Sequence, residues 1–170
     1  MNEIVIFIAS YVYLVSIVTF IGYFFYTKDA RRRRFLLLSI FTLPLSYLTG
    51  LFASSLYYDP RPFVVLHITP LIKHAADNGF PSDHALLMGT LAAIIMVFNK
   101  RLGIFLWVLA ILVGAARVLA SVHHAIDILA SFGIALCATA IVYSVLKHYI
   151  FKQESSASVQ RLENTTSNSN

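Results

Sequence analysis

The sequence predicts an all-α integral membrane protein: a bundle of about five transmembrane helices with its functional site at the extracytoplasmic face. The first reason is composition. Of 170 residues, 58% are hydrophobic and 12% are charged, and the mean hydropathy is +0.75. A soluble domain carries about 25% charged residues. The chain therefore has too few polar side chains to cover a water-facing globule, and lipid must cover much of its surface.

The second reason is a succession of apolar segments. A helix needs about 20 residues to cross the ~30 Å hydrocarbon core of a bilayer. The segments cover residues 4–26, 35–57, 84–98, 102–122 and 125–151. The third is short, so we expect it to start at Pro81 and to lie partly inside the protein. Together they predict one membrane domain over residues 1–152, followed by a disordered cytoplasmic tail over residues 153–170.

The third reason is the distribution of Lys and Arg. If the chain crosses five times, ten of its thirteen basic residues lie on one side: Lys28, Arg31, Arg32, Arg33, Arg34, Lys100, Arg101, Lys147, Lys152 and Arg161. Cytoplasmic loops are enriched in Lys and Arg. We therefore expect a multi-pass plasma-membrane protein with its N-terminus outside and its C-terminus in the cytoplasm. The basic runs flank apolar segments, so the net charge of +5 indicates membrane anchoring and not nucleic-acid binding.

Ionisable residues gather on the side opposite to these basic loops. His123 and Asp127 are four residues apart, so on a helix they share one face. The carboxylate can then bond one ring nitrogen, which fixes the tautomer and leaves the other nitrogen as a nucleophile or base. Arg117 supplies a charge whose fork fits phosphate oxygens. A His–Asp pair alone is more often structural, but an arginine in an apolar segment, such as Arg117, is usually functional.

The run Pro81-Ser82-Asp83-His84 opens the third apolar segment. Ser82 is a good helix N-cap, and a helix N-terminus presents unpaired N–H groups that bind anions. Ser82 is therefore a candidate phosphate ligand, and His84 in the first turn could donate a proton to a leaving oxygen. The alternative interpretation is a plain helix cap followed by an interfacial histidine.

The preceding loop carries Arg61 between two prolines, which hold it in a rigid, extended segment. Arg61 is either a phosphate ligand or an interfacial arginine. Lys73, His74 and Asp77 follow in the same loop. We expect these three residues and Asp83 to line the substrate entrance, the alternative being that they are simply solvated.

Taken in order, these motifs resemble the signature of the type 2 phosphatidic acid phosphatase (PAP2) superfamily. That family shows Lys-x6-Arg-Pro, then Pro-Ser-Gly-His, then Ser-Arg-x5-His-x3-Asp. The matching residues are Arg61-Pro62, Pro81-Ser82-Asp83-His84 and Arg117-x5-His123-x3-Asp127. The resemblance implies a helical membrane fold and a reaction that needs no metal or other cofactor.

Three positions depart from the family pattern: Ser54 stands where the family has lysine, Asp83 where it has glycine, and Ala116 where it has serine. The first of these removes one expected phosphate contact. The first two also resemble the bacterial undecaprenyl pyrophosphate phosphatases of the bacitracin-resistance type. The longer matching text is Arg61-Pro62-Phe63-Val64 and the run His-Ala-Ala-Asp-Asn-Gly-Phe-Pro-Ser-Asp-His over residues 74–84.

This second resemblance implies a membrane enzyme that hydrolyses undecaprenyl (polyprenyl) pyrophosphate to the monophosphate and phosphate, recycling the lipid carrier of peptidoglycan synthesis. Its expected partners are that lipid substrate and the surrounding membrane lipids. His123, oriented by Asp127, would form a phosphohistidine, and His84 would protonate the leaving group. The phosphate would be held by Arg61, Ser82 and Arg117.

Other functions stay open at this point. The short motifs fit phosphatidylglycerol phosphate, lipid A or phosphatidic acid equally well as substrates. Six histidines with acidic neighbours could instead form a metal site, although the chain lacks a His-Glu-x-x-His pattern and its arginines would repel a cation. A non-enzymatic membrane partner is disfavoured by the absence of inverted repeats. The oligomeric state and the roles of His67 and His124 are undetermined.

Overall fold

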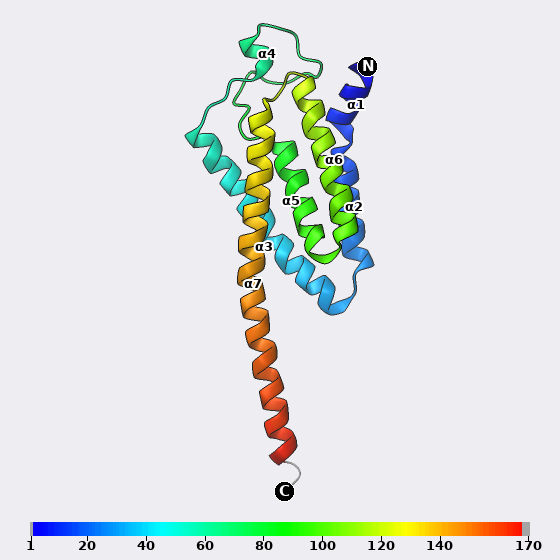
Figure 1. Ribbon diagram of the computed structural model, residues 1–170, viewed down its shortest axis with the longest axis vertical. Helices are drawn as coiled ribbons and strands as arrows, with labels where there is room; N and C mark the ends of the chain where they lie inside the picture. The colour runs from blue at the N-terminus through cyan, green and yellow to red at the C-terminus, as the bar shows by residue number, and fades with distance from the viewer. Residues whose placement is uncertain (1, 168–170) are drawn as a thin grey trace.

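Helices make up most of residues 2–167, the part of the chain that the computed structural model describes (Figure 1). They are α1 (Asn2–Tyr11), α2 (Tyr13–Tyr26), α3 (Asp29–Leu56), α4 (Pro62–Val65), α5 (Asp83–Phe98), α6 (Lys100–Leu119) and α7 (Ala125–Ser167). The described residues form no strand beyond one isolated bridge between Pro60 and Asn78. The all-α expectation is confirmed.

Four helical segments of the described chain are long and apolar enough to cross a membrane: Asn2–Tyr26, Asp29–Leu56, Lys100–Leu119 and Ala125–His148. Large apolar side chains such as Phe25 and Phe52 lie exposed on their outward faces, as expected for surfaces that meet lipid. These segments support a multi-pass membrane protein. The predicted fifth crossing would be α5, whose 16 residues rise only about 24 Å.

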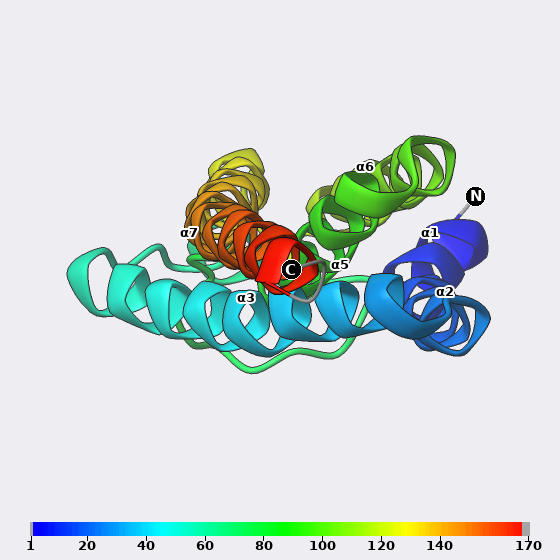
Figure 2. The same cartoon turned by 90° about the horizontal axis from the view of Figure 1, so that it is seen from below.

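The short α5 forms the centre of the bundle. Every residue from Ala85 to Ile95 other than Leu87 is buried, and α5 packs against α2, α3, α6 and α7. Figure 2 shows α3 running across the other helices of the bundle. Because protein surrounds α5, its length need not match the bilayer thickness. This agrees with the expectation that the third apolar segment lies partly inside the protein.

Two glycines permit the close helix packing that positions the site. A Cβ on Gly103 of α6 would lie 2.5 Å from the Cα of Met96 in α5. A Cβ on Gly114 would lie 2.6 Å from Cγ2 of Ile128 in α7. Such distances are shorter than van der Waals contact, so only glycine fits. The second contact brings the end of α6 against the start of α7.

The first predicted span is broken into two helices, which the sequence did not indicate. α1 ends at Tyr11 and α2 begins at Tyr13. A helix end leaves carbonyl groups without intrahelical partners. The carbonyl of Ala9 accepts a hydrogen bond from NH1 of Arg117 at 3.3 Å. The break therefore provides a backbone acceptor for a buried charge.

The two ends of the bundle differ in charge. The N-terminus and the loops around α4 lie at one end, and the turns before α3 and before α6 lie at the other, towards the C-terminus (Figure 1). Arg31 donates a hydrogen bond to the carbonyl of Phe98, which joins the two basic turns. α7 continues as a helix to Ser167, into the region for which the sequence predicts a disordered tail. Residues 168–170 lie outside the described part, and the division into domain and tail stays a prediction.

Candidate active site

Loops from distant parts of the chain meet at the end of the bundle opposite to the basic turns. The amide of Phe63 donates to the carbonyl of Ser121 at 3.1 Å, and the amide of Leu71 donates to the carbonyl of Ala120 at 3.2 Å. These bonds fix the long loop that follows α3 to the turn between α6 and α7. The amide of Gly79 also donates to the carbonyl of Asp59 at 2.8 Å, which closes the loop upon itself.

His123 lies at the centre of this assembly and is 2% exposed. Its Nδ1 is 3.0 Å from the carbonyl oxygen of Gly79 and 3.2 Å from Oδ2 of Asp127. Its Nε2 is 3.4 Å from NH1 of Arg61 and 3.4 Å from NH2 of Arg117. A carbonyl or carboxylate only accepts hydrogen bonds, and a guanidinium only donates them. The proton therefore belongs on Nδ1, and the lone pair of Nε2 faces the two arginines.

The environment also keeps His123 neutral. Burial lowers the pKa of His123 below its ordinary value, and the hydrogen bond to Asp127 opposes this effect only in part. The positive charges of Arg117 and Arg61 lower the pKa further. At neutral pH the ring consequently keeps the lone pair that a nucleophile needs.

Arg61 is held by acceptors on three sides. Its Nε donates to Oδ1 of Asp77 at 2.7 Å, its NH1 to the carbonyl of Val122 at 2.8 Å, and its NH2 to the carbonyl of Asn78 at 3.2 Å. The same bond to Arg61 lowers the pKa of Asp77. The guanidinium is therefore fixed in place, and its charge is partly balanced by one carboxylate.

In the part of the chain that the structure describes, Arg117 has no carboxylate bonded to it. It is 3% exposed and bonds the backbone carbonyl of Ala9, but within the described residues it forms no ion pair. Its Nε is buried without a hydrogen-bond partner, and so is the hydroxyl of Ser82. Unpaired buried donors and an uncompensated buried charge are costly. A site that keeps them favours an anion.

The start of α5 is fixed against the start of α7. The amide of Ser82 donates to the carbonyl of Asp127 at 3.4 Å, and the hydroxyl of Ser131 donates to the carbonyl of Ser82 at 2.9 Å. His84 follows in the first turn and packs edge-on against the ring of Tyr13, with centroids 4.9 Å apart. It is near enough to His123 for their charges to interact.

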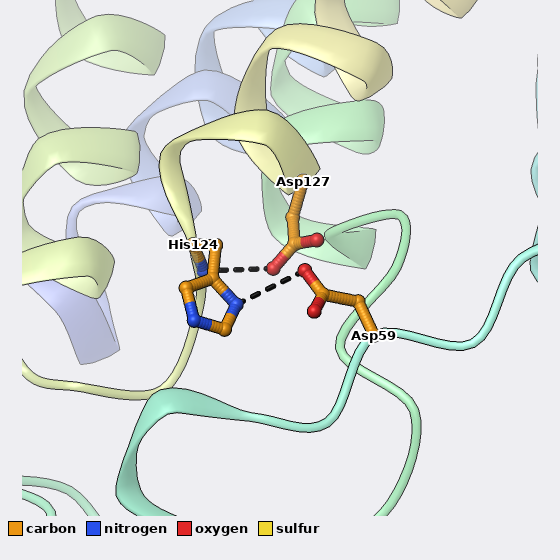
Figure 3. A group of neighbouring side chains, drawn as sticks. All are labelled: Asp59, His124 and Asp127. Atoms are coloured by element: carbon orange, nitrogen blue, oxygen red, sulfur yellow. Dashed lines mark hydrogen bonds and ion pairs between the residues drawn. The ribbon is translucent and has the colours of Figure 1, made fainter. Parts of the chain in front are cut away.

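A second imidazole–carboxylate pair adjoins the first, and the sequence did not predict it (Figure 3). Nδ1 of His124 lies 3.0 Å from Oδ2 of Asp59, and its backbone amide donates to Oδ2 of Asp127 at 2.8 Å. Burial, followed by the charge of Asp127, raises the pKa of Asp59. Ligand atoms of the three residues lie within 4.8 Å of one another, so by type they could hold a metal ion. In the structure they bond with one another instead.

The predicted site residues fall into two groups. The structure brings together His123, Asp127, Arg61, Arg117, Ser82, Asp77, His74 and His84. Lys73 is exposed on the loop surface. Asp83 is also exposed and lines a cavity of about 240 Å³ between α3 and α5. The structure gives the positions of these residues, and their roles in binding and catalysis stay predictions.

Asn78 is a further organising residue that the sequence reasoning missed. Its Oδ1 accepts from the amides of Asp59 and Phe80, and its amide group donates to the hydroxyl of Ser54 at 3.0 Å and to the carbonyl of Tyr57. Ser54, which stands at the place of the family lysine, thus anchors the loop. The Asp-Asn-Gly sequence, typical of turns, was the available signal.

The sequence matches the PAP2 superfamily over residues 35–150, a range that holds all the predicted site residues. The chain belongs to the PAP2 superfamily. This PAP2 chain is 31% identical over 132 residues to the bacitracin transport permease protein BcrC of Bacillus licheniformis. It is 32% identical over 141 residues to the undecaprenyl-diphosphatase BcrC of Bacillus subtilis (strain 168). The resemblance to both families is confirmed.

The matched regions differ in their share of each chain. They cover 76% and 80% of this PAP2 chain, and 64% and 70% of the Bacillus licheniformis and Bacillus subtilis proteins. The chain therefore spans about two thirds of the length of these relatives.

Two solved structures share the PAP2 fold seen here. The crystal structure of Aquifex aeolicus LpxE superposes with a TM-score of 0.71 and 21% identity, covering 85% of this chain and 87% of that one. The PAP2 type phosphatidylglycerolphosphate phosphatase from Bacillus subtilis gives a TM-score of 0.57 and 23% identity, covering 86% and 77%. Both comparisons concern the fold alone.

Proposed function

We propose that this PAP2 phosphatase hydrolyses a polyprenyl pyrophosphate, with undecaprenyl pyrophosphate as the natural substrate, to the monophosphate and inorganic phosphate. The main support for this reaction is the position of Nε2 of His123, which lies 3.4 Å from NH1 of Arg61 and 3.4 Å from NH2 of Arg117, with its lone pair towards both guanidinium groups. A nucleophile flanked by two fixed cations suits attack on an anionic phosphoryl group. The choice of lipid is supported by the relative named undecaprenyl-diphosphatase.

In the first step, the Nε2 of His123 attacks the terminal phosphorus. The bond from phosphorus to the bridging oxygen breaks, and its electron pair leaves with the polyprenyl phosphate. Arg61, Arg117 and the hydroxyl of Ser82 stabilise charge on the equatorial oxygens. His84 supplies a proton to the departing oxygen. The Nδ1–H bond to Asp127 stabilises the positive charge that develops on the ring of His123.

In the second step, water attacks the phosphohistidine. His84, now neutral, accepts a proton from this water. The phosphorus–nitrogen bond breaks, its electron pair returns to Nε2 of His123, and inorganic phosphate leaves. The donors that hold the phosphoryl group serve both steps, because its three equatorial oxygens stay in place.

The site is proposed to face the extracytoplasmic side. The turns that carry Arg31–Arg34 and Lys100–Arg101 lie at the opposite end of the bundle (Figure 1). Cytoplasmic loops are the ones enriched in Lys and Arg. With α5 counted as a fifth crossing, the N-terminus and the site lie outside and the C-terminus lies in the cytoplasm.

The reaction is further proposed to need no metal ion. Arg61 and Arg117 already supply two positive charges beside His123. The nearby group of Asp59, His124 and Asp127 has the composition of a metal site. Its Asp127, however, serves His123 in the proposed mechanism, so a bound cation would compete with that hydrogen bond.

The test is phosphate release by the purified full-length chain in detergent. Undecaprenyl pyrophosphate, phosphatidylglycerol phosphate, lipid A and phosphatidic acid are compared at equal concentration, with and without EDTA. We expect preference for the pyrophosphate, no effect of EDTA, and loss of more than about 10⁴-fold in kcat for His123→Ala. Acid-labile labelling of wild type by ³²P-substrate would identify the intermediate. Preference for another lipid, or full activity of His123→Ala, would refute the proposal.

A further inference from the structure

A third histidine lies beside the proposed phosphoryl site and has no part in the mechanism above. The ring of His74 is centred 6.2 Å from the ring of His123, at an interplanar angle of 74°. Its side chain is 26% exposed, so it lies between the buried His123 and bulk water. The loop that carries it is fixed to the α6–α7 turn by the bond from the amide of Leu71 to the carbonyl of Ala120.

His74 shares a partner with the phosphate-binding Arg61. Oδ1 of Asp77 is 2.7 Å from Nε of Arg61 and 3.9 Å from Nδ1 of His74. Nδ1 of His74 also lies 3.4 Å from the carbonyl oxygen of Ala75. Both neighbours of Nδ1 are acceptors, so Nδ1 carries the proton in the neutral ring. Within the described chain, Nε2 at the other edge of the ring makes no hydrogen bond.

The site thus contains one imidazole more than hydrolysis of a phosphate monoester requires. A nucleophile and a general acid account for His123 and His84. Because the rings of His123 and His74 are centred 6.2 Å apart, an anionic substrate whose phosphorus lies about 3–3.5 Å from Nε2 of His123 also lies close to the ring of His74. A substrate with two phosphates brings a second anion, for which Nε2 of His74 is the free partner.

We propose that His74 binds the second phosphate of the substrate, the one that stays on the lipid, and so makes the site selective for lipid diphosphates over monophosphates. Asp77 is a positioning residue that orients His74 and Arg61 together. The inference rests on the proposed function and specifies its substrate class.

The proposal includes coupled uptake of a proton. The titratable and charged groups that face His74 are Arg61, Arg117, Asp77, His84 and His123. Burial and the charge of Arg61 lower the pKa of His74 in the free enzyme, so at neutral pH Nε2 is unprotonated. An anionic phosphate next to the ring raises that pKa. Diphosphate binding therefore takes up a proton on Nε2, and its affinity falls as pH rises through the pKa of His74 in the complex.

The experiment compares farnesyl pyrophosphate with farnesyl phosphate, which differ only in the number of phosphates. Initial rates of phosphate release are measured with purified full-length wild type and His74→Ala in detergent. We expect His74→Ala to raise KM for the diphosphate about tenfold or more, equivalent to about 1.4 kcal/mol, and to change kcat/KM for the monophosphate less than twofold. His67→Asn is the matched control, because His67 is an exposed histidine of the same loop at φ 52°, which asparagine tolerates.

A second variant separates charge from loop structure. Lysine at this position carries its charge at all pH values used, so His74→Lys should restore part of the diphosphate affinity and remove the rise of KM with pH. Equal losses for both substrates in His74→Ala, or no change in either, would overturn the assignment of His74 while leaving the proposed function standing. If wild type releases phosphate from the monophosphate but not from the diphosphate, the proposed function fails and this inference fails with it.

Discussion

The carbonyl oxygen of Gly79 lies 3.0 Å from Nδ1 of His123, slightly closer than the 3.2 Å that separates the same nitrogen from Oδ2 of Asp127. The tautomer of the proposed nucleophile is thus held by two acceptors, one of which belongs to the backbone. No side-chain substitution removes that carbonyl. The contribution of Asp127 to catalysis can therefore be divided into two parts: its negative charge, and the hydrogen bond that it accepts from Nδ1 of His123.

This division predicts different outcomes for two substitutions of Asp127. Asp127→Ala leaves the bond to Gly79 and should lower kcat/KM by about 10²–10³-fold through loss of charge. Asp127→Asn should cost less than Asp127→Ala, because Oδ2 accepts from both the His124 amide and Nδ1 of His123, so an asparagine oxygen in its place keeps both bonds and the tautomer. Phosphate release measures both. An Asn variant less active than the Ala variant would contradict the arrangement.

The pH profile of the reaction follows from the lowered pKa of His123. Protonation of Nε2 removes the lone pair, so kcat/KM should fall by about tenfold for each pH unit below that pKa. Because burial lowers the pKa, we expect this acid limb to lie below the ordinary histidine value of 6.5. The bond to Asp127 raises the pKa, so in Asp127→Ala the limb should move to still lower pH. Both enzymes are measured with the same substrate, so that ionisation of the substrate affects the two pH profiles equally. A shift of the acid limb to higher pH in Asp127→Ala would contradict the prediction.

The two arginines should respond differently to lysine. Arg61 joins Asp77, Val122 and Asn78, and hydrogen bonds to charged groups contribute about 1.5–3 kcal/mol. Arg61→Lys should therefore lower the Tm by about 4–8 °C, as well as raising KM. Arg117→Lys keeps the charge without breaking a loop, so it should raise KM about tenfold with a Tm within about 2 °C of wild type. Thermal unfolding in detergent, followed by fluorescence, distinguishes the two.

A matched pair of glycines tests the helix packing. Gly103→Ala places a Cβ 2.5 Å from the backbone of Met96 and should destabilise the protein by about 1–3 kcal/mol. Gly133→Ala adds a Cβ with no atom within 4 Å, so it should be neutral or stabilise α7 by up to about 1 kcal/mol. Melting curves of the two variants check the difference. Equal effects would mean that α5 and α6 approach less closely than described.

Composition and the succession of long apolar segments predicted the helical membrane fold, since both reflect contact with lipid. The shortness of the third segment also indicated its burial as α5. The break between Tyr11 and Tyr13 was not foreseen, because no proline or glycine marks it. Its partner, Arg117, lies more than 100 residues away in the sequence. Such a break is a tertiary effect and leaves no local pattern.

The site could be predicted where it depends on side chains at fixed spacing. Arg61, Arg117, His123 and Asp127 do lie together. The groups that orient them could not be found in this way, because several are backbone carbonyls, which every residue possesses. The pairing of Asp59 with His124 depends on how the loop after α3 folds, and sequence spacing does not show that.

The contact between Arg117 and the carbonyl of Ala9 places a requirement on a segment that lies before the family match begins at residue 35. What Arg117 needs there is an interrupted helix at the right depth, since any amino acid can supply the oxygen. Related chains could therefore diverge freely in this segment and still preserve the contact. Selection would act upon backbone conformation, and a comparison of amino-acid identities would miss it.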